Sequence, residues 1–479
     1  MNFKFIRIIA FQEWRTAFRS KIPLVLYAVL LAVILLSAFT GWQYVNEFNK
    51  QQANARHDVN EHWMNQPNRH PHRVAHYGYL VFREKSPLSF FDFGLDSYVG
   101  NSVFLEAHRQ NTVNMSEAGF SNGMLRFGEL SMALVFQLLV PLFIIFIGFH
   151  TVAGLKQNGV LKILLSQRAS YFDILLGKTL GLTAVSWALF LPVLLLGLIT
   201  GVTFLYGETS TLPVVRIGFL FLIYGLYMFI VSLAVVAVSA ISKNAANALV
   251  LLVLAWILCF IVIPKGAQTL GNNIYNAPDK IAFENAIEKD VSEQGDSHNP
   301  DDPHYAQLKS ETLKKYGVDS IQNLPVNYGA LVMQEGEKIS SGIYNSHYDK
   351  LIITYKSQNS ISAILAFTDP FLAIRNISMT VCGVDFETYS EFQKQTENYR
   401  FEKTRKINEI HLTKISYKND RDQKADQSNW QKQADFEFKP VSIFDTLKNA
   451  ALGFAALLIW AITGFAVLKY ISSIRKYQL

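Results

Sequence analysis

Histidine is the residue type whose number and spacing in this sequence come closest to a reactive site. Six histidines fall between positions 57 and 108: His57, His62, His70, His72, His76 and His108. Imidazole is the commonest side-chain ligand of transition metals, and two histidines one residue apart in an extended chain can share an ion. No cysteine or acid completes a ligand set at the usual spacing, and Pro71 favours a rigid turn. The sequence therefore favours solvated or hydrogen-bonding histidines and predicts no metal; the candidate ligands, if an ion binds, are His70, His72 and His76.

A second pattern is Gly177-Lys178-Thr179, which matches the end of the phosphate-binding sequence G-x-x-x-x-G-K-[ST]. That sequence also needs a glycine five residues earlier, and position 172 is Phe172. The preceding residues Ile174 to Leu176 form an apolar helical stripe, whereas phosphate is held by a glycine-rich loop. We therefore expect no nucleotide site in this chain.

Other catalytic patterns are missing from the sequence. H-E-x-x-H and G-x-S-x-G do not occur, and Ser, His and Asp form no convincing grouping. No charged residue lies near the centre of a long apolar run, as a proton-coupled carrier usually requires. We expect a protein that is not an enzyme and binds no cofactor directly, and whose energy comes from a separate ATPase.

Composition places the chain in a membrane. Of its 479 residues 50% are hydrophobic and only 17% are charged, and the mean hydropathy is +0.17. These values are typical of membrane spans combined with sizeable water-exposed parts. The net charge of +6 is spread among acids, with no basic aromatic patch, so nucleic acid is not expected as a partner. Cys259 and Cys382 do not indicate a disulfide framework.

Six apolar runs approach the length of about 20 residues that crosses a bilayer. They predict a mainly α, polytopic protein with six transmembrane helices. The predicted division is an interfacial amphipathic helix at 1–21, span 1 at 22–43, an extracytoplasmic domain at 44–129, spans 2 to 5 at 130–263, a second and mostly helical extracytoplasmic domain at 264–448, and span 6 with a tail at 449–479.

The distribution of cations predicts that both termini face the cytoplasm, since short cytoplasmic loops are enriched in Lys and Arg. The N-terminal flank, the connection holding Lys156, Lys162 and Arg168, the connection at Lys243 and the C-terminal tail then all lie on one side. In the first outer segment, strand and turn signals occur at 86–100 and the remainder is expected to be irregular. Helices are expected in the second at 283–293, 305–316 and 386–406, with breaks at Pro300, Pro303 and Pro370.

The stretch 154–170 lies between two of the apolar runs and is predicted to hold a short cytoplasmic helix. Residues Val160 to Leu165 are apolar except for Lys162. Leu161 lies three or four residues from Leu164 and Leu165, so these side chains are expected to share one face. A short helix in water cannot cover such a face, and docking into a groove on a partner would.

This stretch resembles the coupling region of ABC-2 type exporter permeases. The matching pieces are Gly159-Val160-Leu161, Leu164-Leu165, the turn 166–170 and Leu175-Leu176-Gly177-Lys178. The sequence departs from that family at 156–158, where acidic residues are usual, and at Val160, where Thr is usual. The resemblance implies that an ATPase subunit is contacted by the residues Gly159, Val160, Leu161, Leu164, Leu165, Arg168 and Lys178.

A second resemblance is to a branch of these permeases that carries an inserted extracytoplasmic domain of unknown function. It rests on the run from His70 to Gly78, on Pro87-Leu88, and on the residues Asp92, Gly94, Tyr98, Gly100 and 105–111. Substrates of that branch are generally unassigned, so this resemblance indicates the branch and not the cargo.

Together the resemblances imply the permease subunit of an ATP-driven exporter in a bacterial cytoplasmic membrane. Two such subunits, alike or different, would associate with two ATPase subunits that bind ATP and Mg²⁺. The alternative is a non-transporting assembly in which the same ATPase drives work on a periplasmic partner. The large outer segments motivate this alternative.

Overall fold

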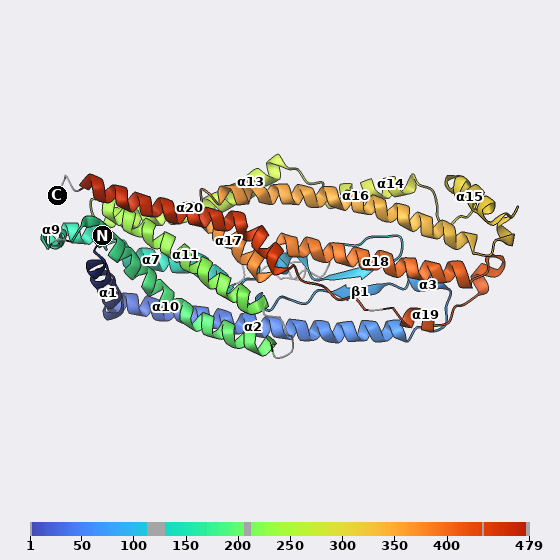
Figure 1. Ribbon diagram of the computed structural model, residues 1–479, viewed down its shortest axis with the longest axis horizontal. Helices are drawn as coiled ribbons and strands as arrows, with labels where there is room; N and C mark the ends of the chain where they lie inside the picture. Colours follow the sequence, from blue (N-terminus) through green and yellow to red (C-terminus); the bar gives the residue numbers. More distant parts are fainter. Residues whose placement is uncertain (1, 113–129, 168, 206–211, 434, 476–479) are drawn as a thin grey trace.

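The computed structural model describes residues 2–112, 130–167, 169–205, 212–433 and 435–475. The molecule is mainly helical and elongated (Figure 1). One end holds both termini and helix α9 (Val160–Ser166). The opposite end holds α15 (Ala306–Tyr316) and the polar ends of several long helices.

Six helical stretches in the described ranges are long and apolar enough to cross a membrane, as the sequence predicts. Their bounds are Lys21–Met64, Met132–Gln157, Tyr171–Thr200, Val214–Ile241, Ala245–Ile274 and Ile443–Ile474. The helices that carry them are α2 (Lys21–Met64), α6 to α8 (Met132–Leu134, Val140–Gly148 and Ala153–Gln157), α10 (Tyr171–Leu205), α11 (Leu212–Ile241), α12 with α13 (Ala245–Ile257 and Ile263–Ile274) and α20 (Ile443–Arg475).

Two of these stretches contain a π-helical turn directly before a proline. The π turns are Val135–Leu139 and Leu258–Val262, and the prolines that follow are Pro141 and Pro264. Proline lacks an amide hydrogen and its ring crowds the preceding turn, so a wider turn accommodates it without ending the helix.

Helix α2 corrects the expectation of an irregular chain after residue 43. It continues without interruption to Met64, 44 residues in all, so it is about 66 Å long. A hydrocarbon layer is only about 30 Å thick. Residues 44–64 contain neither Pro nor Gly, so nothing ends the helix where the apolar run ends.

The strands also lie elsewhere than expected. The antiparallel pair is β1 (Tyr79–Phe82) with β2 (Ser102–Leu105), in the register Tyr79 to Leu105. The predicted strand region at 86–100 instead forms turns and the short helix α4 (Asp96–Val99). Tyr79, Val81, Val103 and Leu105 are buried beside α18 (Phe386–Lys414) in a core of their own.

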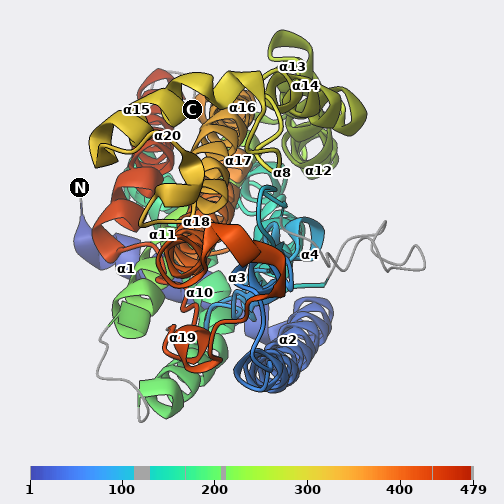
Figure 2. The ribbon, with the colours of Figure 1, turned by 90° about the vertical axis from the view of Figure 1, so that its right-hand side faces the viewer.

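The second polar segment is largely helical. The predicted helices are found as α14 (Lys280–Ser292), α15 and α18, but the sequence analysis missed the longest, α16 (Tyr328–Leu365). Short helices α3 (Pro71–Ala75) and α19 (Ser428–Gln431), with 3-10 turns at Pro303–Tyr305, Ile321–Asn323 and Tyr417–Asp422, complete this region. Viewed from the α15 end, α18 lies between α16 and α3 (Figure 2).

Helix α17 (Pro370–Cys382) corrects the assignment of 264–448 to one outer domain. Asp369 caps its first turn, and its residues Ala373, Ile374 and Ile377 are buried in the same core as the apolar helices α11 and α20. The apolar face of α17 is buried because the neighbouring helices pack against it. The segment therefore returns into the helix bundle before α18 begins.

The guanidinium of Arg216, on α11, fixes the end of α17. It donates hydrogen bonds to the carbonyl of Val381 at 3.0 Å, the carbonyl of Val441 at 2.9 Å and the hydroxyl of Thr446 at 3.1 Å. A cation at a helix C-terminus also interacts favourably with the helix dipole. Arg216 thus joins α11, α17 and the start of α20.

Replacing Arg216 by Met should destabilise this junction by roughly 2–4 kcal/mol, because buried carbonyls would lose charged donors. The measurement is thermal unfolding of the protein in detergent. Arg375→Met is the control, since Arg375 lies on α17 but is exposed. Equal unfolding temperatures for the two variants would contradict the role given to Arg216.

Candidate functional site

The end of the molecule that holds α9 is built by helices from distant parts of the chain. α1 (Phe3–Arg19) lies across the first turns of α10, and α8 packs against α9 and the turn after α11. α1 exposes Phe3, Ile8 and Phe11, which is typical of a helix at a membrane surface.

The turn between α7 and α8 is fixed by Ser239 of α11. Its hydroxyl accepts hydrogen bonds from the amides of Val152 and Ala153, both at 3.1 Å, and donates to the carbonyl of Phe149 at 2.8 Å. One turn later, the ammonium of Lys156 donates to the carbonyl of Ser242 at 3.2 Å. The base of the α8–α9 unit is therefore attached to α11.

Helix α9 forms where the sequence predicts it, but the side chains it exposes are not the predicted ones. Leu161 is 1% exposed and packs into the core of the bundle, and Leu164 and Leu165 are half-buried against that core. The apolar side chains that reach solvent are Val160 and Ile163, which are 37% and 58% exposed.

Of the predicted docking face, Leu161 is covered by its own chain, whereas Leu164 and Leu165 keep part of their surface in solvent. Gly159 is exposed and precedes the helix with a φ of +73°, a conformation that favours glycine. Arg168 lies outside the described residues.

Lys178 pairs with another part of its own chain. It is buried at 8% exposure, and its ammonium forms an ion pair with Glu13 of α1. The amide of Asn2 also donates to Asp173 of α10 at 3.0 Å. The sequence analysis missed Glu13 and Asp173, and it assigned Lys178 to contact with the ATPase.

The pattern Gly177-x-x-x-Gly181 was the available signal for this contact. A Cβ on Gly177 would lie 2.8 Å from the Cβ of Ile9, and one on Gly181 would lie 2.8 Å from the carbonyl oxygen of Ala10. Paired small residues let two helices approach this closely within a membrane. The Gly-Lys-Thr run is thus part of a helix-packing surface.

Gly181→Leu should push α1 away from α10, because the added side chain has no room. Overpacking costs about 1–3 kcal/mol, so tryptic cleavage inside α1 should become roughly tenfold faster. Gly218→Leu on α11 is the matched control, since a Cβ there meets nothing within 4 Å. An unchanged cleavage rate in Gly181→Leu would contradict this packing.

The structure separates the three histidines that the sequence suggests as ligands. His72 and His76 meet His108, and also His298 from the segment after α14, with one ring nitrogen of each lying within 4.8 Å of the others. Burial, and then the charges of His76 and His298, lower the pKa of His72 to about 3. No local pattern around His298 indicated that it would join the group.

His70 belongs to a different group. Its Nδ1 accepts a hydrogen bond from the amide of His72 at 3.3 Å and caps α3, and its Nε2 lies 3.6 Å from Asp420. Asp420 also lies 2.6 Å from Nε2 of His411 and accepts from Asn327 at 2.5 Å. Although burial opposes ionisation, the hydrogen bond from His411 and the nearby ring of His70 lower the pKa of Asp420.

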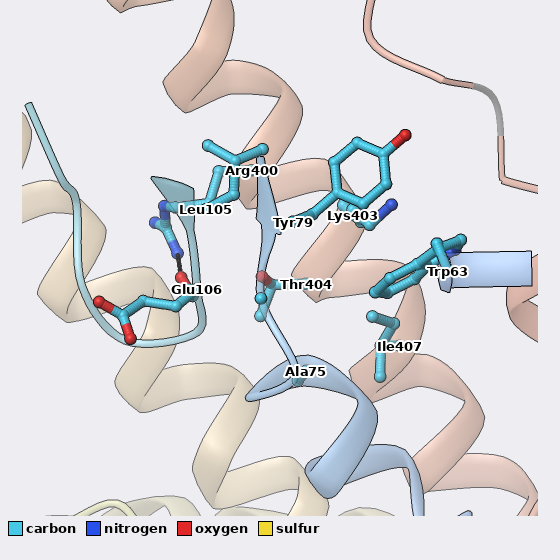
Figure 3. Close-up of a pocket in the computed structure, with 10 residues that line it drawn as sticks. Trp63, Ala75, Tyr79, Leu105, Glu106, Arg400, Lys403, Thr404 and Ile407 are labelled. Atoms are coloured by element: carbon cyan, nitrogen blue, oxygen red, sulfur yellow. Dashed lines mark hydrogen bonds between the residues drawn. The ribbon is translucent and has the colours of Figure 1, made fainter. Parts of the chain in front are cut away.

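A small pocket lies beside α18 (Figure 3). It is lined by residues of β1, β2, α3, α18 and the end of α2. Its residues Ala75 and Glu106 lie one and two positions before His76 and His108 in the sequence, so the pocket is close to the four-histidine group. The ammonium of Lys403 lies 3.6 Å from the ring centroid of Trp63 and 3.9 Å from that of Tyr79. Burial lowers the pKa of Lys403 to about 7, although the charge of Asp435 acts in the opposite direction.

Stability should rise with pH between about 7 and 10, because the unfolded chain keeps the Lys403 proton in this range and the folded protein has lost it. Lys403→Met should remove most of this rise. Thermal unfolding across that pH range measures it. Lys394→Met, which alters an exposed lysine on the same helix, should keep the rise. The same pH profile in wild type and Lys403→Met would contradict the depressed pKa.

Comparison with known proteins identifies one segment. The family described as "Domain of unknown function (DUF3526)" matches residues 280–439, about a third of the chain. The matched segment runs from α14 past α19 and includes His298, Glu337 and Lys403. No curated protein matches the chain.

Proposed function

We propose that the chain is the permease subunit of an ATP-driven ABC exporter in a bacterial cytoplasmic membrane. The observation that carries the proposal is the exposed apolar pair Val160 and Ile163. The pair lies on a short helix at one end of a bundle with six candidate spans. Water does not favour such a pair, and a groove on an ATPase subunit would cover it.

The proposed topology places α9, α1 and both termini in the cytoplasm. Lys162 lies on α9, Lys243 follows α11, and Lys469 lies in the last turns of α20. Positive charge of this kind is retained on the cytoplasmic side of a membrane. The opposite end, with α15, α18 and the four histidines, would then lie outside the membrane.

Two attachments would carry motion from an ATPase into the spans. Leu161 anchors α9 in the bundle core, and the Gly177–Gly181 surface with the Lys178–Glu13 ion pair anchors α1 to α10. Closure of an ATPase dimer on ATP and Mg²⁺ would press on α9 and shift α7, α10 and α11 through these contacts. The chain itself would bind neither ATP nor Mg²⁺.

A second permease subunit, identical or different, is part of the proposal. The apolar windows of α12–α13 and α20 are only 11% and 17% buried, whereas those of the α6–α8 and α11 spans are 67% and 61% buried. Lipid and a partner subunit together would cover these open faces.

The alternative function is a non-transporting assembly in which the ATPase moves a periplasmic partner. The uninterrupted 44 residues of α2 favour it, because a continuous helix can transmit motion far beyond the bilayer. Reconstitution in vesicles with candidate cargo separates the two, since ATP-dependent accumulation of any cargo supports export.

Ile163→Asp should abolish co-purification with the proposed ATPase subunit. A charge placed in an apolar groove costs about 3–5 kcal/mol, which weakens binding by roughly two to four orders of magnitude. Expression should be unchanged, because the side chain is exposed.

Lys162→Ala is the control for Ile163→Asp, as it changes the neighbouring exposed residue without adding a charge to an apolar face. Leu161→Asp should instead lower the yield, because Leu161 is fully buried. If Ile163→Asp retains the ATPase as well as wild type does, α9 is not the docking element.

Accessibility of introduced cysteines tests the topology. Cysteine at Gln167 should react with a membrane-impermeant maleimide only after the cells are opened, whereas cysteine at the exposed His57 should react in intact cells. Cys382 is buried and Cys259 is half-buried, so the parent protein gives the background. Labelling of position 167 in intact cells would reject the proposed orientation.

A further inference from the structure

We propose that His72, His76, His108 and His298 form a binding site for a divalent transition-metal ion, with zinc and copper as the best-matched ions. The site does not depend on the proposed transport function. It is built from three segments that are far apart in the sequence and meet beside α18.

The spacing of the four rings matches a single central ion. Adjacent ring centroids lie 4.6, 5.2, 4.9 and 5.2 Å apart in the order His72, His76, His108, His298, and both diagonals measure 6.1 Å. Metal–nitrogen bonds of about 2.1 Å place centroids roughly 5.3 Å apart in a tetrahedron, or roughly 4.6 and 6.5 Å apart in a square plane. The observed set is a flattened tetrahedron.

His108 is oriented toward the centre by a hydrogen bond on its far side. Its Nδ1 lies 3.0 Å from the carboxylate of Glu337, which also accepts from the His108 amide at 2.8 Å. Its Nε2 is buried and has no hydrogen-bond partner among the described residues. A histidine that donates one nitrogen to a carboxylate and presents the other is the usual arrangement of a metal ligand.

The carboxylate of Glu337 is itself held in place. Arg400 donates to it and also pairs with Glu397 at 2.7 Å, and all three side chains are at least 95% buried. Glu337 thus holds a fixed carboxylate behind one ligand.

The other three histidines are positioned by different contacts. His72 and His76 are one helical turn apart at α3, so both reach the same side. His298 has its Nδ1 3.3 Å from Asp296, which leaves Nε2 for an ion. His76 and His298 are exposed, so an ion can enter from solvent.

Four imidazoles favour zinc, copper or nickel over magnesium and calcium, which prefer oxygen. A site in which the protein supplies every ligand is typical of structural ions. The ion would fasten residues 72–108 to the segment 280–439, and would therefore stabilise the packing between these two regions.

The test uses the full chain, purified in detergent through a tag without histidine, stripped with chelator and incubated with zinc chloride or copper sulfate. After desalting, elemental analysis should find close to one ion per chain. Zinc should raise the unfolding temperature by a few degrees. Cobalt chloride should give the intense visible absorption of a tetrahedral or flattened site.

His298→Ala should reduce the bound metal at least tenfold and remove the thermal shift, and because its ring is exposed the variant should fold. His304→Ala is the matched control, as it removes an exposed histidine of the same loop that is outside the group. Metal retained equally by His298→Ala and wild type, or no metal retained by wild type, would overturn the proposal.

Discussion

The structure depends on a buried cation where the apolar bundle meets the polar region. Arg216 can be buried only because two backbone carbonyls and one hydroxyl accept its hydrogen bonds. Those acceptors come from the end of α17 and the beginning of α20, so burying the charge fixes both ends of the region between them. The polar domain is in this way attached to α11 at a defined position.

Hydropathy predicted six spans because a bilayer requires about 20 apolar residues, and that signal is local. The packing of α17 in the bundle was not predicted, because its 13 residues are too few to span a membrane. The helical structure of the polar half of α2 was not predicted, because the end of an apolar run marks the edge of the membrane and does not mark the end of a helix. Residues 44–66 contain neither Pro nor Gly, so no helix-breaking residue follows the apolar run and the chain stays helical to Met64.

The candidate site residues also divide into those that local sequence predicts and those that depend on distant contacts. α9 was predictable from its flanks, but the face it presents depends on which residues the bundle covers, and Leu161 is covered. The sequence around Lys178 predicted a contact with a partner, but its ammonium pairs with Glu13, which is far away in the sequence. His298 had no local signal at all. Long-range contacts of this kind cannot be read from spacing in a single sequence.

Under the proposed function the two ends of the molecule have different tasks: α9 would receive an ATPase, and the polar end is held together around α18. The most direct test of this central claim places a photo-crosslinking amino acid at Ile163, with Ile281 as the comparison because both are exposed. The account predicts an adduct between position 163 and a nucleotide-binding subunit, and none from position 281. An adduct with that subunit from position 281, or none from position 163, would contradict it.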